Sequence, residues 1–441
     1  MQITILTVGT RGDVQPYVAL GLGLRRAGHA VRLATHGIFR EFVAGCGLDF
    51  APVEGNPQEV MSGAEGQEWL ESGRNPIAFL RHGMKLLRPL LERMLTDSIT
   101  ACEGAEAIIF STFAFGGYHV AEKMGVPCIG SALQPLARTR AFPNIQVHPR
   151  WKLGGAFNYL THVLGEQAFW MMLKGPINEW RRDTLGLPPI GFGGPMRVVQ
   201  QKRLPYLYGY SQHVVPKPPD WVEWLHVTGY WFLDGASDWQ PPSDLRDFLS
   251  DGPTPVYVGF GSMTPRQAEF LTTTAIEALK RAGQRGILLT GWGGIGKSDL
   301  PDSVLKIDAV PHEWLFPRMA ALVHHGGAGT TAEGLRAGVP SVVTPFFADQ
   351  PFWGQRVADL GVGPAPIPQK QLTAGALAEA IRVAVTDADM RHRAAALGQK
   401  IRAEDGVARA VEAFHQHVTR ISHGLHGPAS IPARSGRRVN S

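Results

Sequence analysis

The chain has 441 residues, of which 44% are hydrophobic and 18% charged, a size and composition typical of a globular protein with two domains. Its 43 basic and 38 acidic residues give a formal net charge of +5, an excess too small to indicate a nucleic-acid partner. Three scattered cysteines indicate neither a disulfide framework nor a metal site, so we expect a cytoplasmic protein without bound metal. We also expect no signal peptide, and no membrane span, because no apolar run approaches about 18 residues.

The chain opens with a pattern typical of a parallel β-α-β unit. Ile3–Val8 is a compact, β-branched run that predicts a buried strand. The turn Gly9–Gly12 and a helix over Val14–Ala27 follow, and Gly28 ends that helix. A second strand over Ala30–Ala34 would then lie parallel to the first.

Asp13 stands at the tip of the first strand and at the start of the first helix. Ligands of open parallel sheets bind at the carboxyl ends of the strands, which makes Asp13 a candidate site residue. Aspartate is also a common N-cap, and Thr10 is an alternative cap, so the position alone leaves both interpretations open.

The rest of the first half continues the alternation of elements. From Phe39 to Asn75 we expect short strands and loops, with one strand over Leu48–Val53. Pro76–Ile99 carries the apolar stripe of an amphipathic helix, which would pack on the sheet or meet a membrane surface or an acceptor. We expect further strands over Ala105–Ser111 and Val126–Ser131, with a helix over Phe115–Met124 between them.

Residues 134–189 are rich in aromatic and methionine side chains. Such side chains fill either an ordinary core or a pocket for an apolar ligand. His119 could act as a base, although its place inside a helix favours packing. Our candidates for lining an apolar acceptor site are Phe113, Gln134, Phe142 and Trp170.

Residues 233–255 are rich in Asp, Pro, Ser and Gly and predict an interdomain linker. The alternation of strands and helices then restarts. The expected elements are strands over Val256–Phe260, Gly286–Thr290 and Val304–Ile307 and a helix over Arg266–Ala282.

The most informative stretch is a glycine-rich turn. Ala320–Val323 predicts a buried strand, Gly326, Gly327 and Gly329 form the turn, and a helix begins near Ala328. The free N–H groups and the dipole of a helix N-terminus favour an anion, and glycine lets the backbone approach it closely. The pattern therefore predicts a phosphate site.

Polar side chains accompany this turn. Thr330 could add a hydroxyl donor, and His325 could reach the same phosphate. Glu333 shares a helix face with Thr330, where its carboxylate could accept hydrogen bonds from a ribose diol. A tight turn with capping threonines is the purely structural alternative.

The stretch resembles the donor-binding signature of nucleotide-sugar glycosyltransferases with two facing Rossmann-like domains, the GT-B fold. The matching residues are His325, Gly327, Thr330, Glu333, Asp349 and Gln350. The resemblance implies that His325 and Thr330 bind the diphosphate, within the turn that includes Gly329. It also implies that Glu333 binds the ribose. Asp349 and Gln350 would hold the hydroxyls of the transferred sugar.

The resemblance also concerns the nucleobase. Plant relatives have a tryptophan that stacks on uracil and, three positions later, a glutamine, whereas this chain has Ala309 and His312. Base recognition would therefore fall to the backbone near Val310 and to Trp292. Ser262 would reach a phosphate from the opposite wall.

The first loop matches the family pattern Gly-His-x-x-Pro with an aspartate in place of the histidine, as Gly12-Asp13-Val14-Gln15-Pro16. The longer string GTRGDVQPYVALGLGLRRAGHAVRLATHGIFREFV is similar to sterol 3-beta-glucosyltransferases, and the aspartate is typical also of bacterial antibiotic (macrolide/glycopeptide) glycosyltransferases. A carboxylate is ionised at neutral pH and needs no partner to fix a tautomer. The resemblance thus implies that Asp13 is a lone base, with Thr10, Arg11 and Gly12 near the donor phosphate. Arg11 either attracts the donor or is only a loop charge.

We therefore predict an α/β protein with the GT-B fold, in which two Rossmann-like, doubly wound parallel-sheet domains face a cleft. The predicted parts are an acceptor-binding domain over 1–232, a linker over 233–255, a nucleotide-sugar-binding domain over 256–405, a C-terminal helix over 406–423 that crosses back to the first domain, and a disordered tail over 424–441.

The predicted reaction is a metal-independent, inverting transfer of a hexose, glucose by resemblance, from a UDP-sugar to a hydroxyl of an apolar acceptor. A sterol, triterpenoid or polyketide-type aglycone fits that description. UDP-glucose or a related nucleotide-sugar is a co-substrate, and no cofactor is expected. Peripheral membrane contact would give access to such an acceptor.

Two other functions stay open, a nucleotide-sugar epimerase of the same fold and a non-catalytic nucleotide-sugar-binding protein. A dehydrogenase is disfavoured, because Gly9–Gly12 lacks the spacing of a G-x-G-x-x-G fingerprint.

Overall fold

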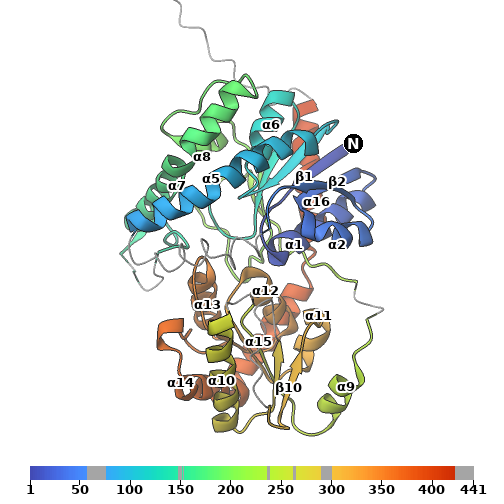
Figure 1. The fold of residues 1–441 in the computed structure, drawn as a ribbon, viewed down its shortest axis with the longest axis vertical. Helices are drawn as coiled ribbons and strands as arrows, with labels where there is room; N and C mark the ends of the chain where they lie inside the picture. The colour runs from blue at the N-terminus through green and yellow to red at the C-terminus, as the bar shows by residue number, and fades with distance from the viewer. Residues whose placement is uncertain are drawn as a thin grey trace, which may run out of the picture.

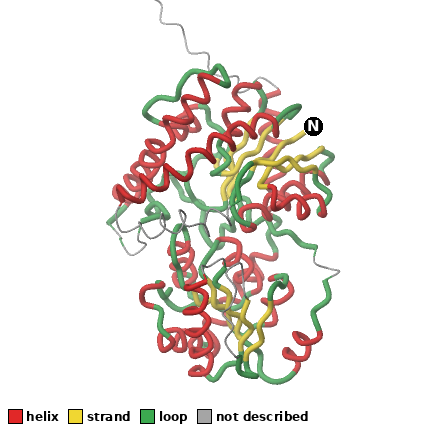
Figure 2. The backbone as a smooth tube through the Cα atoms, in the orientation of Figure 1, coloured by secondary structure: helices red, strands yellow, loops and turns green. Residues whose placement is uncertain are grey.

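The computed structural model describes residues 1–56, 76–147, 151, 153–235, 239–261, 265–289 and 300–422. This part of the chain forms two parallel sheets, each flanked by helices and stacked one above the other along the long axis of the molecule (Figure 1). Figure 2 shows the strands inside each half and the helices around them. The prediction of two doubly wound parallel-sheet domains is confirmed.

The first sheet has seven strands in the order β3-β2-β1-β4-β5-β6-β7, all paired in parallel. The sequence interpretation did not assign the last two strands. The bounds are β1 Gln2–Leu6, β2 Ala30–His36, β3 Asp49–Val53, β4 Ala107–Ser111, β5 Cys128–Ala132, β6 Tyr206–Tyr208 and β7 Leu225–Val227.

Six α-helices of the described chain accompany this sheet. They are α1 Arg11–Arg26, α2 Arg40–Gly45, α5 Pro76–Ala101, α6 Gly116–Met124, α7 Gly155–Asp183 and α8 Gly194–Gln201, with a 3₁₀ turn, η1, at Gly37–Phe39. Three of them correct the sequence interpretation, because α2 lies where only strands and loops were expected, and α7 and α8 lie in stretches for which no helix was assigned.

The second sheet has five parallel strands in the order β10-β9-β8-β11-β12. Its strands are β8 Val256–Gly259, β9 Gly286–Leu289, β10 Val304–Ile307, β11 Ala321–His324 and β12 Ser341–Val343. The helices around it are α10 Pro265–Ala282, α11 His312–Leu315, α12 Ala328–Ala337, α13 Gln350–Asp359, α14 Ala374–Thr386 and α15 Ala388–Arg402, with 3₁₀ turns η4 at Phe316–Arg318 and η5 at Gln369–Gln371.

The strand order fixes where ligands can bind. In both sheets the order reverses at one point, between β1 and β4 in the first sheet and between β8 and β11 in the second. Ligands of such sheets bind beyond the carboxyl ends of the strands at the reversal. The loops after β1 and β11, which carry Asp13 and His325, lie at these two points.

An apolar cluster holds the two halves together. Tyr210 of the first half packs edge-on against Trp353 of α13 with ring centroids 6.4 Å apart, and both are buried. Arg356 of α13 donates to the carbonyl of Val214 at 3.0 Å through Nε. The interface is therefore a packed core, which limits how freely the halves can move apart.

The chain crosses between the halves twice within the described residues. The first crossing follows β7, and the stretch predicted as a linker contains a short helix, α9 Ser243–Ser250. The second leads into α16, Gly406–Ser422, which packs on α1 of the first half (Figure 1). The crossings touch, since a Cβ added at Gly229 would lie 3.0 Å from the Cα of Gly406. The tail after 422 lies outside the described residues.

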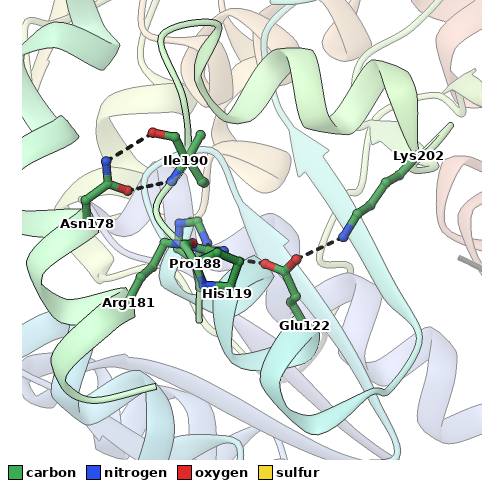
Figure 3. Close-up of polar contacts among 7 residues, drawn as sticks. All are labelled: His119, Glu122, Asn178, Arg181, Pro188, Ile190 and Lys202. Carbon is green, nitrogen blue, oxygen red and sulfur yellow. Dashed lines mark hydrogen bonds and ion pairs between the residues drawn. The ribbon is translucent and has the colours of Figure 1, made fainter. Parts of the chain in front are cut away.

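A polar cluster around buried Arg181 joins α6 and α7 to Lys202, the residue that follows α8 (Figure 3). Arg181 is buried, and its Nη1 lies 2.8 Å from both His119 Nδ1 and Glu122 Oε2. Lys202 holds the other carboxylate oxygen of Glu122 at 3.0 Å. Burial and the neighbouring guanidinium lower the pKa of His119 to about 3, so its imidazole stays neutral and packs inside the fold.

None of the helices in the described part of the chain is long and apolar enough to cross a membrane.

The contact between α1 and α16 generates a stability prediction. A Cβ added at Gly23 would collide with Val407 of α16. We expect Gly23→Ala to lower the free energy of unfolding by about 1–3 kcal/mol, because the overlap outweighs the helix propensity that alanine gains. Thermal or urea unfolding measures the change.

Gly45→Ala is the matched control, because Gly45 ends α2, is exposed and has open space around it. Adding Val407→Ala to Gly23→Ala should recover part of the loss. Equal stability of the two glycine variants would contradict the proposed overlap.

Candidate functional site

The loop after β1 holds Asp13 at the start of α1. Its Oδ2 accepts hydrogen bonds from the N–H of Thr10 at 2.9 Å and from the Thr10 hydroxyl at 3.0 Å. Thr10 is the N-cap of α1, and Asp13 is the third residue of the helix. The structure therefore shows Asp13 bonded back to the N-cap residue, while Thr10 occupies the cap itself.

Asp13 is a half-buried carboxyl with an altered acidity. Burial raises its pKa to about 6, against the opposing effect of the two Thr10 hydrogen bonds. The negative charge of Asp349 raises it further. A carboxyl with this pKa is mostly ionised at neutral pH and can still take up a proton, which suits a general base.

Two residues fix the loop around Asp13. Gly9 has a φ of +133°, and a Cβ there would collide with the Asp13 carboxylate, so the position requires glycine. The Gly9 N–H donates to His36 Nε2 at 3.1 Å, and His36 Nδ1 lies 3.3 Å from the carbonyl of Val53. These contacts require neutral His36 with its proton on Nδ1. The sequence interpretation missed His36, because this last residue of β2 belongs to no recognisable motif.

The turn between β11 and α12 has the geometry expected of an anion site. Buried His324 accepts the Gly326 N–H at Nδ1, 3.0 Å away, which shapes the turn. The first bond of the helix ladder runs from the N–H of Thr331 to the carbonyl of Gly327. The preceding amides, including that of Thr330, therefore stand at the open end of α12. His324 is a second residue whose role sequence reasoning did not assign.

His325 lies between two glycine loops. A Cβ at Gly327 would come within 2.6 Å of its Nε2, and one at Gly261 within 3.1 Å of its Cε1. Gly261 follows β8, so the imidazole sits where the loops of both central strands meet. Burial lowers the pKa of His325 to about 4. At neutral pH it can therefore offer a phosphate an N–H donor without a full positive charge.

Glu333 lies two turns into the same helix and is largely buried. Its Oε2 is 3.5 Å from Nε of Arg336. Burial raises the pKa of Glu333 to about 7, while the Arg336 charge opposes the rise. Its ionisation is therefore balanced close to neutral pH.

Asp349 of the second half contacts a loop of the first half through Gln134. Its Oδ2 accepts from Gln134 Nε2 at 3.2 Å and from Trp353 Nε1 at 2.9 Å. Burial raises its pKa. Gln350 is buried and its Oε1 accepts the N–H groups of Phe346 at 2.8 Å and Phe347 at 3.2 Å. That carbonyl shapes the loop, so the side-chain amide N–H is the part suited to a sugar hydroxyl.

The two candidate loops lie against each other. A Cβ added at Gly329 would be 3.8 Å from the Cα of Gly12. Across this contact, the charge of Arg11 helps lower the pKa of His312 to about 4, after the larger effect of burial. His312 stacks on Phe316 with ring centroids 4.3 Å apart. The structure thus brings the predicted base loop and the predicted donor loop together.

The candidates for lining an acceptor pocket divide into different environments. Phe113 follows β4 and is 54% exposed. Phe142 packs against Phe352 of α13 at a centroid distance of 5.9 Å, so it lies at the interface. Trp170 is buried in the core and donates its indole N–H to the carbonyl of Gly191 at 3.1 Å, and its role in lining an acceptor site stays a prediction.

Three other predicted residues remain. Val310 is partly buried and precedes α11. Ser262 and Trp292 lie outside the described residues. In the portion of the chain that the structure describes, no group of three or more His, Cys, Asp or Glu side chains is placed to hold a metal ion.

Comparison with known protein families assigns both halves. Residues 3–143 match the glycosyltransferase family 28 N-terminal domain. Residues 292–413 match the Erythromycin biosynthesis protein CIII-like, C-terminal domain. The first match covers β1 to β5 of the seven-stranded sheet, and the second covers β10 to β12 of the five-stranded sheet.

The chain is 39% identical over 465 residues to a sterol 3-beta-glucosyltransferase of Cryptococcus neoformans var. neoformans serotype D, with all of this chain and 29% of that relative's length covered. The calicheamicin glycosyltransferase CalG4 superposes with a TM-score of 0.69 at 19% identity, over 96% of this chain and 99% of that one. Glycosyltransferase VinC in complex with DTDP superposes with a TM-score of 0.65 at 19% identity, over 95% of this chain and 100% of that one. The chain belongs to the glycosyltransferases of the GT-B fold and is a relative of the sterol 3-beta-glucosyltransferases.

Proposed function

We propose that the chain is an inverting, metal-independent glycosyltransferase that moves a hexose from a UDP-sugar to a hydroxyl of an apolar acceptor. The observation that carries the proposal is the meeting of the two loops. Asp13, a carboxyl with a raised pKa, lies near enough to Asp349 for their charges to interact. A candidate base and a candidate sugar-binding acid are therefore close enough to influence each other's ionisation, in the region where the loop of Asp13 meets the start of α12.

In the proposed reaction, Asp13 takes the proton of the acceptor hydroxyl while the oxygen attacks the anomeric carbon. The bond from that carbon to the diphosphate breaks on the opposite face, which inverts the configuration. Direct displacement requires one base and a stabilised leaving group.

The charge that develops on the diphosphate would be met by neutral donors. These are the open amides at the start of α12, the hydroxyl of Thr330 and the imidazole of His325. Preorganised donors of this kind contribute much of the stabilisation in such reactions. They can do so without a metal ion, which supports the metal-independent form of the proposal.

The donor and acceptor classes come from the relatives. The similar protein of Cryptococcus neoformans is called a sterol 3-beta-glucosyltransferase, which supports glucose and a sterol as the first pair to test. VinC binds DTDP, which supports a nucleoside diphosphate at α12. Val310, His312 and Trp292 remain our candidates for recognition of the nucleobase.

We further propose a cytoplasmic protein that touches a membrane to reach its acceptor. Three free cysteines support the reducing compartment. The exposed face of α7 supports the membrane contact, because Leu160, Leu164 and Met171 are each more than half exposed and recur on one side of the helix. Between 156 and 175 no exposed residue of α7 is charged. Arg140 lies beside this face, with its guanidinium 5.7 Å from the ring of Tyr159.

Replacing Asp13, the proposed catalytic base, tests the proposed transfer reaction. We expect Asp13→Asn to lower acceptor-dependent UDP release about 100- to 10,000-fold, the usual contribution of a general base. The dissociation constant for UDP should change little, because the substituted amide keeps an oxygen that can accept from Thr10. Purified protein, UDP-glucose and a panel of sterol and polyphenol acceptors provide the assay.

Full activity of Asp13→Asn would remove the proposed base. UDP binding without any acceptor-dependent release by the wild type would favour the binding protein instead. Formation of an epimeric nucleotide-sugar without an acceptor would favour the epimerase.

The pKa of Asp13 predicts the acid limb of the pH profile. Asp13 acts as its carboxylate, so kcat/KM should fall about tenfold per pH unit below pH 6. Thr10→Val removes a hydrogen bond that lowers the pKa of Asp13, so the acid limb of the kcat/KM profile of this variant should move to higher pH. Rates from pH 4.5 to 8.5 measure both midpoints. An unchanged midpoint in Thr10→Val would contradict this account of the acidity of Asp13.

Vesicle binding tests the membrane contact. The double variant Leu160→Glu, Leu164→Glu should bind anionic vesicles at least about tenfold more weakly, since each change removes apolar contact and adds repulsion. Phe270→Glu is the control, because Phe270 is exposed on α10 of the other half. Equal vesicle binding by all three proteins would contradict a role for α7.

A further inference from the structure

We propose that Arg336 is a positioning residue for the nucleotide ribose, which holds the Glu333 carboxylate and ties it to the segment that joins the two halves. The inference rests on the proposed function and deepens it. It concerns an arginine that no sequence motif singled out and that would not touch the ribose itself.

Each nitrogen of the Arg336 guanidinium faces a different carboxylate. Nε lies 3.5 Å from Glu333 Oε2. Nη1 lies 2.7 Å from Asp234 Oδ1, and Nη2 lies 3.6 Å from Glu313 Oε2. The carbon of the group also lies 4.2 Å from the ring centroid of Phe232. A planar cation with contacts on its edges and its face has little freedom to rotate.

These contacts come from separate parts of the fold. Glu333 and Arg336 share α12, Glu313 is on α11, and Phe232 and Asp234 follow β7 where the chain leaves the first half. The carbonyl of Arg336 also accepts a hydrogen bond from Arg402 of α15. The ribose candidate and the interdomain segment are thus linked through a single side chain.

The charges explain what Arg336 supplies. Within the described residues, the other charged groups that face Glu333 are Glu313 and Asp234, and both disfavour its ionisation. Burial has the same effect and is larger. Arg336 opposes all three. A ribose diol donates two O–H groups, and a carboxylate accepts both more strongly than a protonated acid does.

UDP binding measured against pH tests the inference. Wild-type affinity should decline as pH falls through 7, where Glu333 takes up a proton. Arg336→Gln should raise the midpoint of this affinity profile by about one pH unit. The dissociation constant for UDP should then be several-fold higher than that of the wild type at pH 7 and approach about tenfold higher below pH 7. At high pH the two dissociation constants should become similar. Arg336→Lys keeps the charge and should restore part of the affinity. Calorimetric titrations from pH 6 to 9 give the constants.

Two comparisons separate positioning from a merely structural role. In a Glu333→Gln background, Arg336→Gln should cause no further loss, because the group through which it acts is absent. Arg382→Gln is the matched control, since Arg382 forms an exposed i,i+3 pair with Glu379 on α14. Protonation of the UDP phosphate itself is common to all variants.

The outcomes are distinct. A loss in Arg336→Gln that is equal at every pH, no loss at all, or additivity with Glu333→Gln would overturn the inference. If Arg336→Gln does not fold, Arg336→Lys with and without Glu333→Gln gives the same decision. Failure of the wild type to bind UDP would instead overturn the proposed donor, and the inference with it.

Discussion

Two helices point their N-termini at one spot between the sheets, and the site depends on this constraint. The start of α1 reaches the start of α12 through Gly12 and Gly329, where neither residue carries a Cβ. Each helix end has a partial positive charge, so their approach is unfavourable until an anion lies between or beside them. Asp13 offsets part of that field from within the first turn of α1. The remainder favours a ligand with negative charge.

Burial then sets the acidity of the groups around that spot. It raises the pKa values of Asp13, Glu333 and Asp349, and it lowers those of His312 and His325. The histidines stay neutral and the acids titrate closer to neutral pH. A site of weak acids and neutral donors can therefore bind a phosphate and still exchange protons with a substrate.

Sequence patterns predicted the parts of the fold that local chemistry determines. The strands β1, β8 and β11 are compact apolar runs, and glycine turns mark the loops of Asp13 and His325, so both loops could be placed at the strand ends. Helix α7 could not be predicted in this way, because Gly165, Gly175 and Pro176 disfavour a helix at these positions. Its own apolar residues are also spread around the helix and form no single stripe. The roles of His36, His324 and Arg336 depend on partners that lie in other elements, and no spacing along the chain reveals them.

The two chain crossings have a mechanical consequence. Gly229, with a φ of +108°, lies against Gly406, so the outgoing and returning segments run side by side. A second connection beside the first leaves the two halves less freedom to twist or slide against each other than a single connection would. The crossings act together with the contact between Tyr210 and Trp353, which restrains the same movement at the interface. The loops of Asp13 and Asp349 are therefore held in one register by the path of the chain as well as by side-chain packing.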